Sequence, residues 1–161
     1  MYDRFGEFDS AREINETAVN LRKEGDIESI KILAKENGID EDIVEVFVDG
    51  TLLFLCDDSA AALGKIEVEK VHNKCTELME DWCEYIKDMC FKDEEFARAV
   101  RSKNKNLAGC IVELMKYGFK HQTELSSEIK KAAGVSAGRV TFGIPGMATA
   151  KKIIREYYLG K

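Results

Sequence analysis

Proline is almost absent from this chain, which holds a single one, Pro145, among its 161 residues. Because proline inside a helix removes a hydrogen bond and clashes with the preceding turn, its scarcity permits long uninterrupted helices. It also argues against a loop-rich β-sandwich. Apolar residues make up 45% of the chain, too many for a disordered protein, and charged residues make up 34%, too many for a membrane protein. We therefore expect a globular helical protein.

Helix start and stop signals divide the chain into seven or eight segments. The clearest start is the capping box Ser10-x-x-Glu13, and the clearest stops are Gly25 and Asn37-Gly38. Apolar residues at helical spacing fill the segments between such signals. The predicted helices cover approximately 11–24, 27–37, 41–56, 57–90, 94–103, 107–119, 126–134 and 147–159. The predicted fold class is therefore all-α: a compact multi-helix domain of seven or eight helices, in which a glycine-rich joint, 138–146, precedes the C-terminal helix.

Residues 40–56 fit two assignments. Val44, Phe47 and Val48 could belong to a strand that ends in an Asp49-Gly50 turn. We prefer a helix, because these residues recur at helical spacing and the flanking segments are helical.

Two helices are expected to supply most of the core. The longest runs over 57–90, with Gly64 as the place where it would break early, and carries an apolar seam suited to packing against other helices. The seam comprises Val71, Cys75, Leu78, Trp82, Tyr85 and Met89. The central core helix is predicted over 107–119, with its apolar residues Leu107, Cys110, Ile111, Leu114, Met115 and Phe119.

Neither a catalytic nor a metal site is expected. The five cysteines form no Cys-x-x-Cys pair and lie in apolar patterns, so we interpret them as reduced thiols packed in the core of a cytoplasmic protein. His72 and Cys75 share a helix face, but a zinc site needs four ligands and the other two are missing. No nucleophile–base arrangement is identifiable, and the N-terminus lacks the pattern of a signal peptide. We predict a protein that is not an enzyme, has no cofactor and does not associate with membranes.

Charge is distributed unevenly along the chain. Residues 1–100 hold 12 Lys and Arg against 26 Asp and Glu, a net charge of −14, whereas residues 101–161 hold 12 against 4, a net charge of +8. Such a split indicates either two surfaces with different partners or two halves that attract each other. We divide the chain into an acidic helical region, 1–58, and a helical domain with a basic C-terminal part, 59–161. The candidate acidic partner face comprises Glu80, Asp81 and Glu84.

A basic candidate surface lies in the C-terminal part. Lys151, Lys152 and Arg155 are predicted to form one exposed stripe on the last helix. Upstream, the segment from Ile129 to Val140, with Gly-Val-Ser at its centre, is similar to the turn of a helix-turn-helix motif. In that reading Arg139 belongs to the second helix, and the cations of the last helix contact phosphates. Packing and solvation alone are the competing explanation for both features.

Two groups of residues carry a resemblance to a known family. The first is Asp93-Glu94-Glu95-Phe96-Ala97 followed by Asn104-Lys105-Asn106-Leu107-x-x-Cys110-Ile111, and the second is Met147-Ala148 followed by Tyr157-Tyr158. Together they cover about residues 80–160. In these residues the chain resembles the PcfK-like proteins of conjugative plasmids and integrative elements, some of which are anti-CRISPR inhibitors. The N-terminal helical region, the Gly134–Gly146 insertion and the lack of an acidic tail depart from the simple pattern, although a longer subgroup shares the stretch that begins at Gly143-Ile144-Pro145.

The resemblance implies a mobile-element protein that acts by binding. Its suspected partner is a type II RNA-guided CRISPR nuclease, which the chain would inhibit without catalysis. The alternative is a small DNA-binding accessory protein of a conjugative or integrative element, using Arg139, Lys151, Lys152 and Arg155. The resemblance carries over no catalytic residue.

Overall fold

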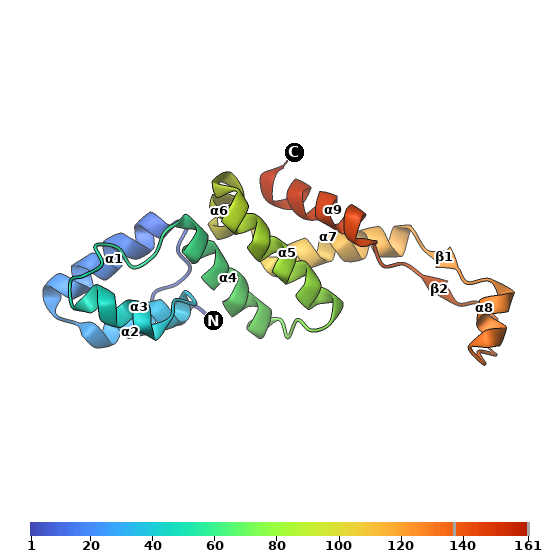
Figure 1. Cartoon of the computed structure of the whole chain (residues 1–161), viewed down its shortest axis with the longest axis horizontal. Helices are drawn as coiled ribbons and strands as arrows, with labels where there is room; N and C mark the ends of the chain where they lie inside the picture. The colour runs from blue at the N-terminus through green and yellow to red at the C-terminus, as the bar shows by residue number, and fades with distance from the viewer. Residues whose placement is uncertain (137, 161) are drawn as a thin grey trace.

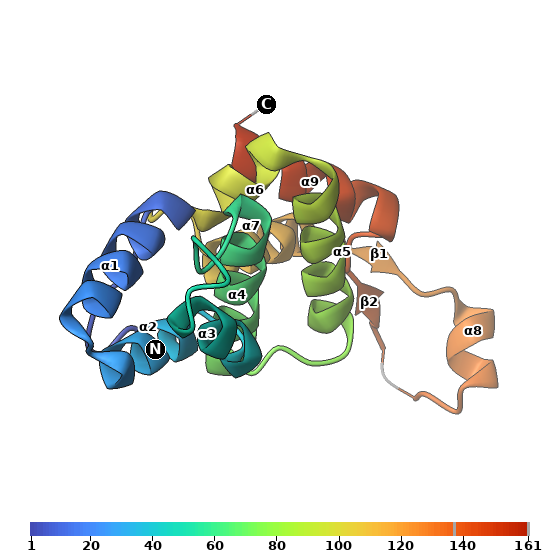
Figure 2. The same ribbon diagram turned by 60° about the vertical axis from the view of Figure 1, so that its left-hand side comes forward.

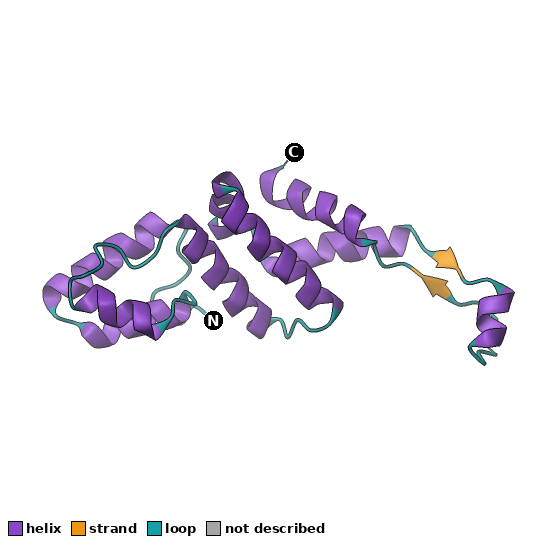
Figure 3. Ribbon diagram, in the orientation of Figure 1, coloured by secondary structure: helices purple, strands orange, loops and turns teal. Residues whose placement is uncertain are grey.

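Nine helices and one short antiparallel strand pair make up the part of the chain that the computed structural model describes, residues 1–136 and 138–160 (Figures 1 and 3). The all-α prediction is confirmed. The helices are α1 (Ala11–Glu24), α2 (Ile27–Glu36), α3 (Glu41–Val48), α4 (Asp58–His72), α5 (Leu78–Lys92), α6 (Glu94–Arg101), α7 (Leu107–Lys120), α8 (Ser127–Ala132) and α9 (Met147–Leu159). The strands are β1 (Thr123–Glu124) and β2 (Thr141–Phe142).

Polar caps begin most of these helices. Ser10 Oγ accepts the Glu13 backbone N–H at 3.3 Å, and the Glu13 carboxylate accepts the Asp9 backbone N–H at 2.8 Å. Each cap satisfies an N–H that has no partner inside the helix. Comparable side-chain caps begin α2, α4, α6, α7 and α8, at Asp26, Asp57, Asp93, Asn106 and Ser126. Gly25 ends α1 in the left-handed conformation, as predicted.

Two hydrophobic cores meet along α4. Residues of α1, α2, α3 and the loop after α3 form the first core, which includes Ala61 of α4. The next residue, Ala62, belongs to the second core, which α5, α6, α7 and α9 complete. Seen from the side, α4 therefore separates the N-terminal helices from the C-terminal ones (Figures 1 and 2).

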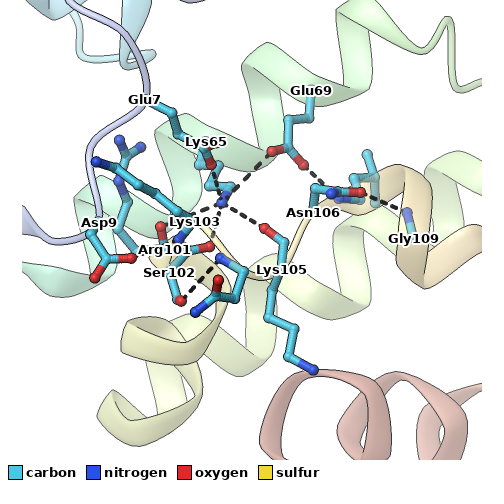
Figure 4. A network of polar contacts seen from close by, with 12 residues as sticks. Glu7, Asp9, Lys65, Glu69, Arg101, Ser102, Lys103, Lys105, Asn106 and Gly109 are labelled. Atoms are coloured by element: carbon cyan, nitrogen blue, oxygen red, sulfur yellow. Dashed lines mark hydrogen bonds and ion pairs between the residues drawn. The ribbon is translucent and has the colours of Figure 1, made fainter.

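Buried charges occupy the junction between the two cores (Figure 4). The ammonium of Lys65 is fully buried and donates to the carbonyls of Ser102 and Lys105, at 2.8 and 2.7 Å. It also forms an ion pair with Glu7 at 2.6 Å. Because a buried charge is tolerated only when it is paired and hydrogen-bonded, these contacts fix the N-terminal segment against α4 and the loop before α7.

Arg101 and Glu69 complete this polar junction. The Arg101 guanidinium donates to Asn37 Oδ1 at 2.8 Å, and the Glu69 carboxylate accepts the Leu107 backbone N–H at 2.5 Å. Burial raises the pKa of Glu69 and lowers that of Arg101. These contacts connect α6 to the end of α2 and α4 to the start of α7, so we interpret the junction as structural.

The predicted continuous helix over 57–90 is wrong. It divides into α4 and α5, joined by a turn in which Lys74 and Glu77 have positive φ. The break exposes Val71, at 77%, while Trp82 is buried as expected. Gly64 does not interrupt α4. It lies against the C-terminal end of α2, where a Cβ atom would come within 2.0 Å of the Asn37 carbonyl oxygen.

The ambiguous segment 40–56 is helical only over α3. The preferred assignment is confirmed for Glu41–Val48, but the helix does not continue to Cys56. The Asp49 carboxylate accepts the Thr51 backbone N–H at 2.8 Å, which stabilises a turn there.

The segment that is similar to a helix-turn-helix does not form one among the described residues. α8 ends at Ala132, and Gly134 adopts the left-handed conformation, but the residues described after it contain β2 instead of a second helix. β2 pairs with β1, with Thr123 opposite Phe142 and Glu124 opposite Thr141. Arg139 therefore lies just before β2 and does not belong to a recognition helix.

Candidate interaction surface

An arm projects from the helical body between α7 and α9. We define the arm as residues 121–146, of which all but residue 137 are described. β1 leads outward, α8 lies at the far end and β2 leads back (Figures 1 and 2). Pro145 is the only described arm residue that is buried. Ile129 and Val135 near the far end are exposed, although isoleucine and valine side chains are usually buried in folded proteins.

The arm is held by backbone contacts at its base and along its length. Leu125 donates its backbone N–H to the Val140 carbonyl at 2.9 Å, which extends the pairing of β1 and β2. At the base, Gly118 of α7 lies so close to Gly143 that a Cβ atom would be 2.0 Å from the Gly143 carbonyl oxygen. The two glycines allow the returning chain to pack directly on α7.

A groove of about 250 Å³ lies at the base of the arm. Its walls are mostly apolar, with Gln122 as the one polar side chain among the lining residues. The lining residues are Trp82, Leu114, Met115, Gly118, Phe119, Gln122, Gly143, Ile144 and Pro145. Met115 and Phe119 were expected in the core, but they are 50% and 71% exposed. They lie on the side of α7 where the groove stays open between this helix and the base of the arm.

The three predicted cations of α9 are exposed, but two of them contact α5 or the residue that follows it. Lys151 Nζ lies 5.0 Å from the centre of the Tyr85 ring, and Arg155 lies 4.0 Å from the Asp93 carboxylate. Lys152 is exposed on the same helix. The fourth candidate, Arg139, is on the arm and lies 3.8 Å from Glu124. The structure therefore groups the three residues of α9 and places Arg139 on a different element.

The predicted acidic face is largely paired within the chain. Glu80 contacts Lys70 at 2.5 Å, and Glu84 contacts Lys87 at 2.6 Å. The contact with Lys70 lowers the pKa of Glu80 and raises that of Lys70. Asp81 is exposed beside them. The Glu80–Lys70 pair connects α5 to α4, whereas the Glu84–Lys87 pair lies within α5, so much of the negative charge of Glu80 and Glu84 is balanced locally.

His72 and Cys75 do not face a common site. His72 is exposed at the end of α4, whereas Cys75 is buried after it. Within the described residues, no group of three or more histidines, cysteines and carboxylates is placed to hold a metal ion. All five cysteines are free and buried, as predicted.

Comparison of the chain with family models, with curated proteins and with solved structures gave no match. The resemblance to PcfK-like proteins therefore stays a prediction. Among the described residues, no helix combines the length and the apolar character needed to cross a membrane.

Proposed function

We propose that this chain is a non-enzymatic cytoplasmic inhibitor that binds a type II RNA-guided CRISPR nuclease, with the arm as its principal contact. We choose the arm as the contact surface because of its position and its exposed side chains. It projects from the body and exposes aliphatic side chains such as Ile129 and Val135 beside cations such as Lys131. Exposed apolar groups in a polar surround are typical of protein-binding surfaces.

The choice of partner rests on the resemblance to PcfK-like proteins. We expect Glu80 and Glu84 to contribute less to binding than the arm does, because a partner would have to displace Lys70 and Lys87 from them. Asp81 forms no ion pair with any described residue and stays a candidate for the same partner.

Duplex DNA binding is the second candidate function. It is favoured by the three exposed cations of α9 and by the cations of the arm, because a two-stranded ribbon can enter a DNA groove. The missing recognition helix weakens it. The two functions differ in what they require: DNA binding needs no nuclease, and its affinity falls steeply with salt.

The decisive experiment measures target cleavage by a purified nuclease–guide complex in the presence of the chain. We expect the wild-type chain to inhibit cleavage and to co-purify with the complex. The double variant Ile129→Asp, Val135→Asp should weaken inhibition about tenfold or more. The matched control, Ile43→Asp with Val46→Asp, changes two exposed residues of the same types on α3 and should inhibit as the wild type does. A wild-type chain that neither binds nor inhibits the complex would refute the proposed partner.

A further inference from the structure

The groove at the base of the arm continues an unpartnered apolar ridge on α7. Val112, Met115 and Phe119 follow one another at steps of three and four residues, so they lie on one face of the helix. All three are exposed. An amphipathic helix of a folded protein normally buries such a face, and an apolar face left open marks an interaction site.

Trp82 gives the groove a buried aromatic wall. Its ring is 5% exposed, and its indole N–H has no hydrogen-bond partner within the described residues. A buried donor without an acceptor is uncommon in folded proteins. The volume of about 250 Å³ suits one or two large apolar side chains, the size of an interface anchor.

Two lysines, Lys120 and Lys151, flank this apolar surface without an ion pair to any described residue. On α7, Lys116 and Lys120 lie beside the ridge, and Lys151 of α9 lies over Tyr85, one helical turn after Trp82. Lys116 is balanced by Glu113 at 2.7 Å, whereas Lys120 forms no ion pair within the part of the chain that the structure describes. Residues 101–161 as a whole carry a net charge of +8. A ligand that covers the ridge would therefore be favoured by carboxylates on its flanks.

We propose that the groove binds an apolar anchor side chain from an acidic amphipathic segment of a protein partner. The segment lies along Val112, Met115 and Phe119, its anchor enters the groove beside Trp82, and its carboxylates face Lys120 and Lys151. This inference rests on the proposed function, because it assigns part of the surface that binds the inhibited nuclease.

The test uses two synthetic helical peptides of about four turns, a length near the limit for an isolated helix. Both carry the same leucine stripe. One has glutamates on its polar face and the other has lysines at the same positions. Trp82 is the only tryptophan of the chain, so its fluorescence reports directly on the groove. We expect the glutamate peptide to shift Trp82 emission in a saturable manner and the lysine peptide to bind at least tenfold more weakly.

Two phenylalanines provide a matched pair of variants. Phe119 on the ridge and Phe91 on α5 are both helical and both 71% exposed. Phe119→Asp should weaken binding of the glutamate peptide about tenfold, whereas Phe91→Asp should leave it unchanged. Equal affinities for the two peptides, or equal effects of the two variants, would overturn the inference.

Failure of this inference can be distinguished from failure of the proposed function. If the wild-type chain inhibits the nuclease but Phe119→Asp inhibits equally well and no peptide binds, the groove assignment is wrong and the inhibitor function stands. If the glutamate peptide binds in the expected pattern but the nuclease is neither bound nor inhibited, the groove chemistry stands and the partner is a different acidic protein.

Discussion

Lys65 of α4 and Glu7 of the N-terminal segment form an ion pair, with 2.6 Å between Nζ and Oε1. Lys65 is fully buried, whereas the Glu7 side chain is 29% exposed. Nearby, the Glu36 carboxylate accepts the backbone N–H groups of Asp3, Arg4 and Phe5. The N-terminal segment is therefore part of the fold, and Glu7 supplies negative charge to a lysine that water does not reach.

Replacing Glu7 should test that contact. Glu7→Gln removes the nearer of the two carboxylates facing Lys65 but leaves Glu69 at 3.8 Å and the carbonyl oxygens of Ser102 and Lys105 as acceptors, so we expect a loss of about 1–3 kcal/mol in unfolding free energy. Urea unfolding measures it as a lower midpoint at unchanged m-value. The control Glu16→Gln breaks an exposed pair with Arg12 and should cost less than about 0.5 kcal/mol. Equal losses would show that the burial of Lys65 is unimportant.

Gly64→Ala should destabilise the protein, although alanine is the better helix former. In the interior of an exposed helix this change is favourable by roughly 0.5–1 kcal/mol. Here the new methyl group would collide with the backbone carbonyl of Asn37, which can move only with the end of α2. We expect a net loss of about 1–3 kcal/mol in thermal or urea unfolding. A gain in stability would contradict the close approach of α2 and α4.

The thiols should be unreactive in the folded protein. Burial raises the pKa of Cys83, Cys90 and Cys110 to about 12, and that of Cys56 to the same value. A disulfide-exchange reagent at pH 8 should therefore label native thiols slowly and label all five rapidly in denaturant. One native thiol that reacts as fast as it does in denaturant would contradict this assignment.

The same shifts predict a loss of stability in alkali. The unfolded chain releases thiol protons near the ordinary pKa of 9.0, whereas the folded chain retains those of these four cysteines until about 12. The stabilising contribution is complete below pH 9 and is lost as the pH rises between these values, because the unfolded state then binds fewer protons. Urea midpoints measured from pH 8 to 11 should fall. Replacing Cys110 with alanine should reduce the slope.

Gly118→Ala should loosen the arm without unfolding the body. The added methyl group would meet the Gly143 carbonyl, where the returning chain packs on α7. We expect faster amide hydrogen exchange at Leu125, whose N–H bonds to the Val140 carbonyl, and unchanged exchange in α4. Exchange that accelerates everywhere would instead indicate that the arm is integral to global stability.

The cations of α9 can be tested by charge reversal. Lys151→Glu with Arg155→Glu removes two candidate phosphate contacts and should leave folding intact, because both side chains are exposed. If duplex DNA is the ligand, the wild-type chain should bind it in a gel shift, with an affinity whose logarithm falls with the logarithm of salt concentration at a slope of about −0.9 per contacted phosphate. The double variant should lose this binding. If the nuclease is bound through the tip of the arm alone, inhibition should persist, whereas an acidic segment of the nuclease that faces Lys151 would make the double variant a weaker inhibitor. Loss of inhibition without DNA binding would place the nuclease contact on α9.

Local signals in the sequence predicted the helices well. Ser10, Asp26, Asp57, Asp93 and Asn106 begin helices because a short polar side chain satisfies a backbone N–H within three residues. The burial of Trp82 and of the five cysteines also follows from apolar spacing. Such signals involve neighbours within about one turn of helix, so they need no knowledge of the rest of the fold.

The candidate site was predicted less well. Arg139 and the cations of α9 are exposed, but the apolar groove, the arm and the partners of Glu80 and Glu84 were missed. Gly143, Pro145 and Gly146 do predict a break between 126 and 159, but a broken helix can still pack back on the bundle, so the projection of the arm had no local signal. Nothing local distinguishes an exposed Phe119 from a buried Leu114.

The sequence by itself determined an all-α protein with buried reduced thiols, because caps, helical spacing and proline scarcity act over a few residues. Only the tertiary structure decided which apolar faces are covered, since Phe119 is exposed where α7 and the base of the arm leave a groove open. It also decided that Lys65 and Arg101 are buried. A lysine or arginine pattern predicts solvent exposure, and burial becomes tolerable only when distant segments, here Glu7 and Asn37, bring the matching groups within hydrogen-bonding distance.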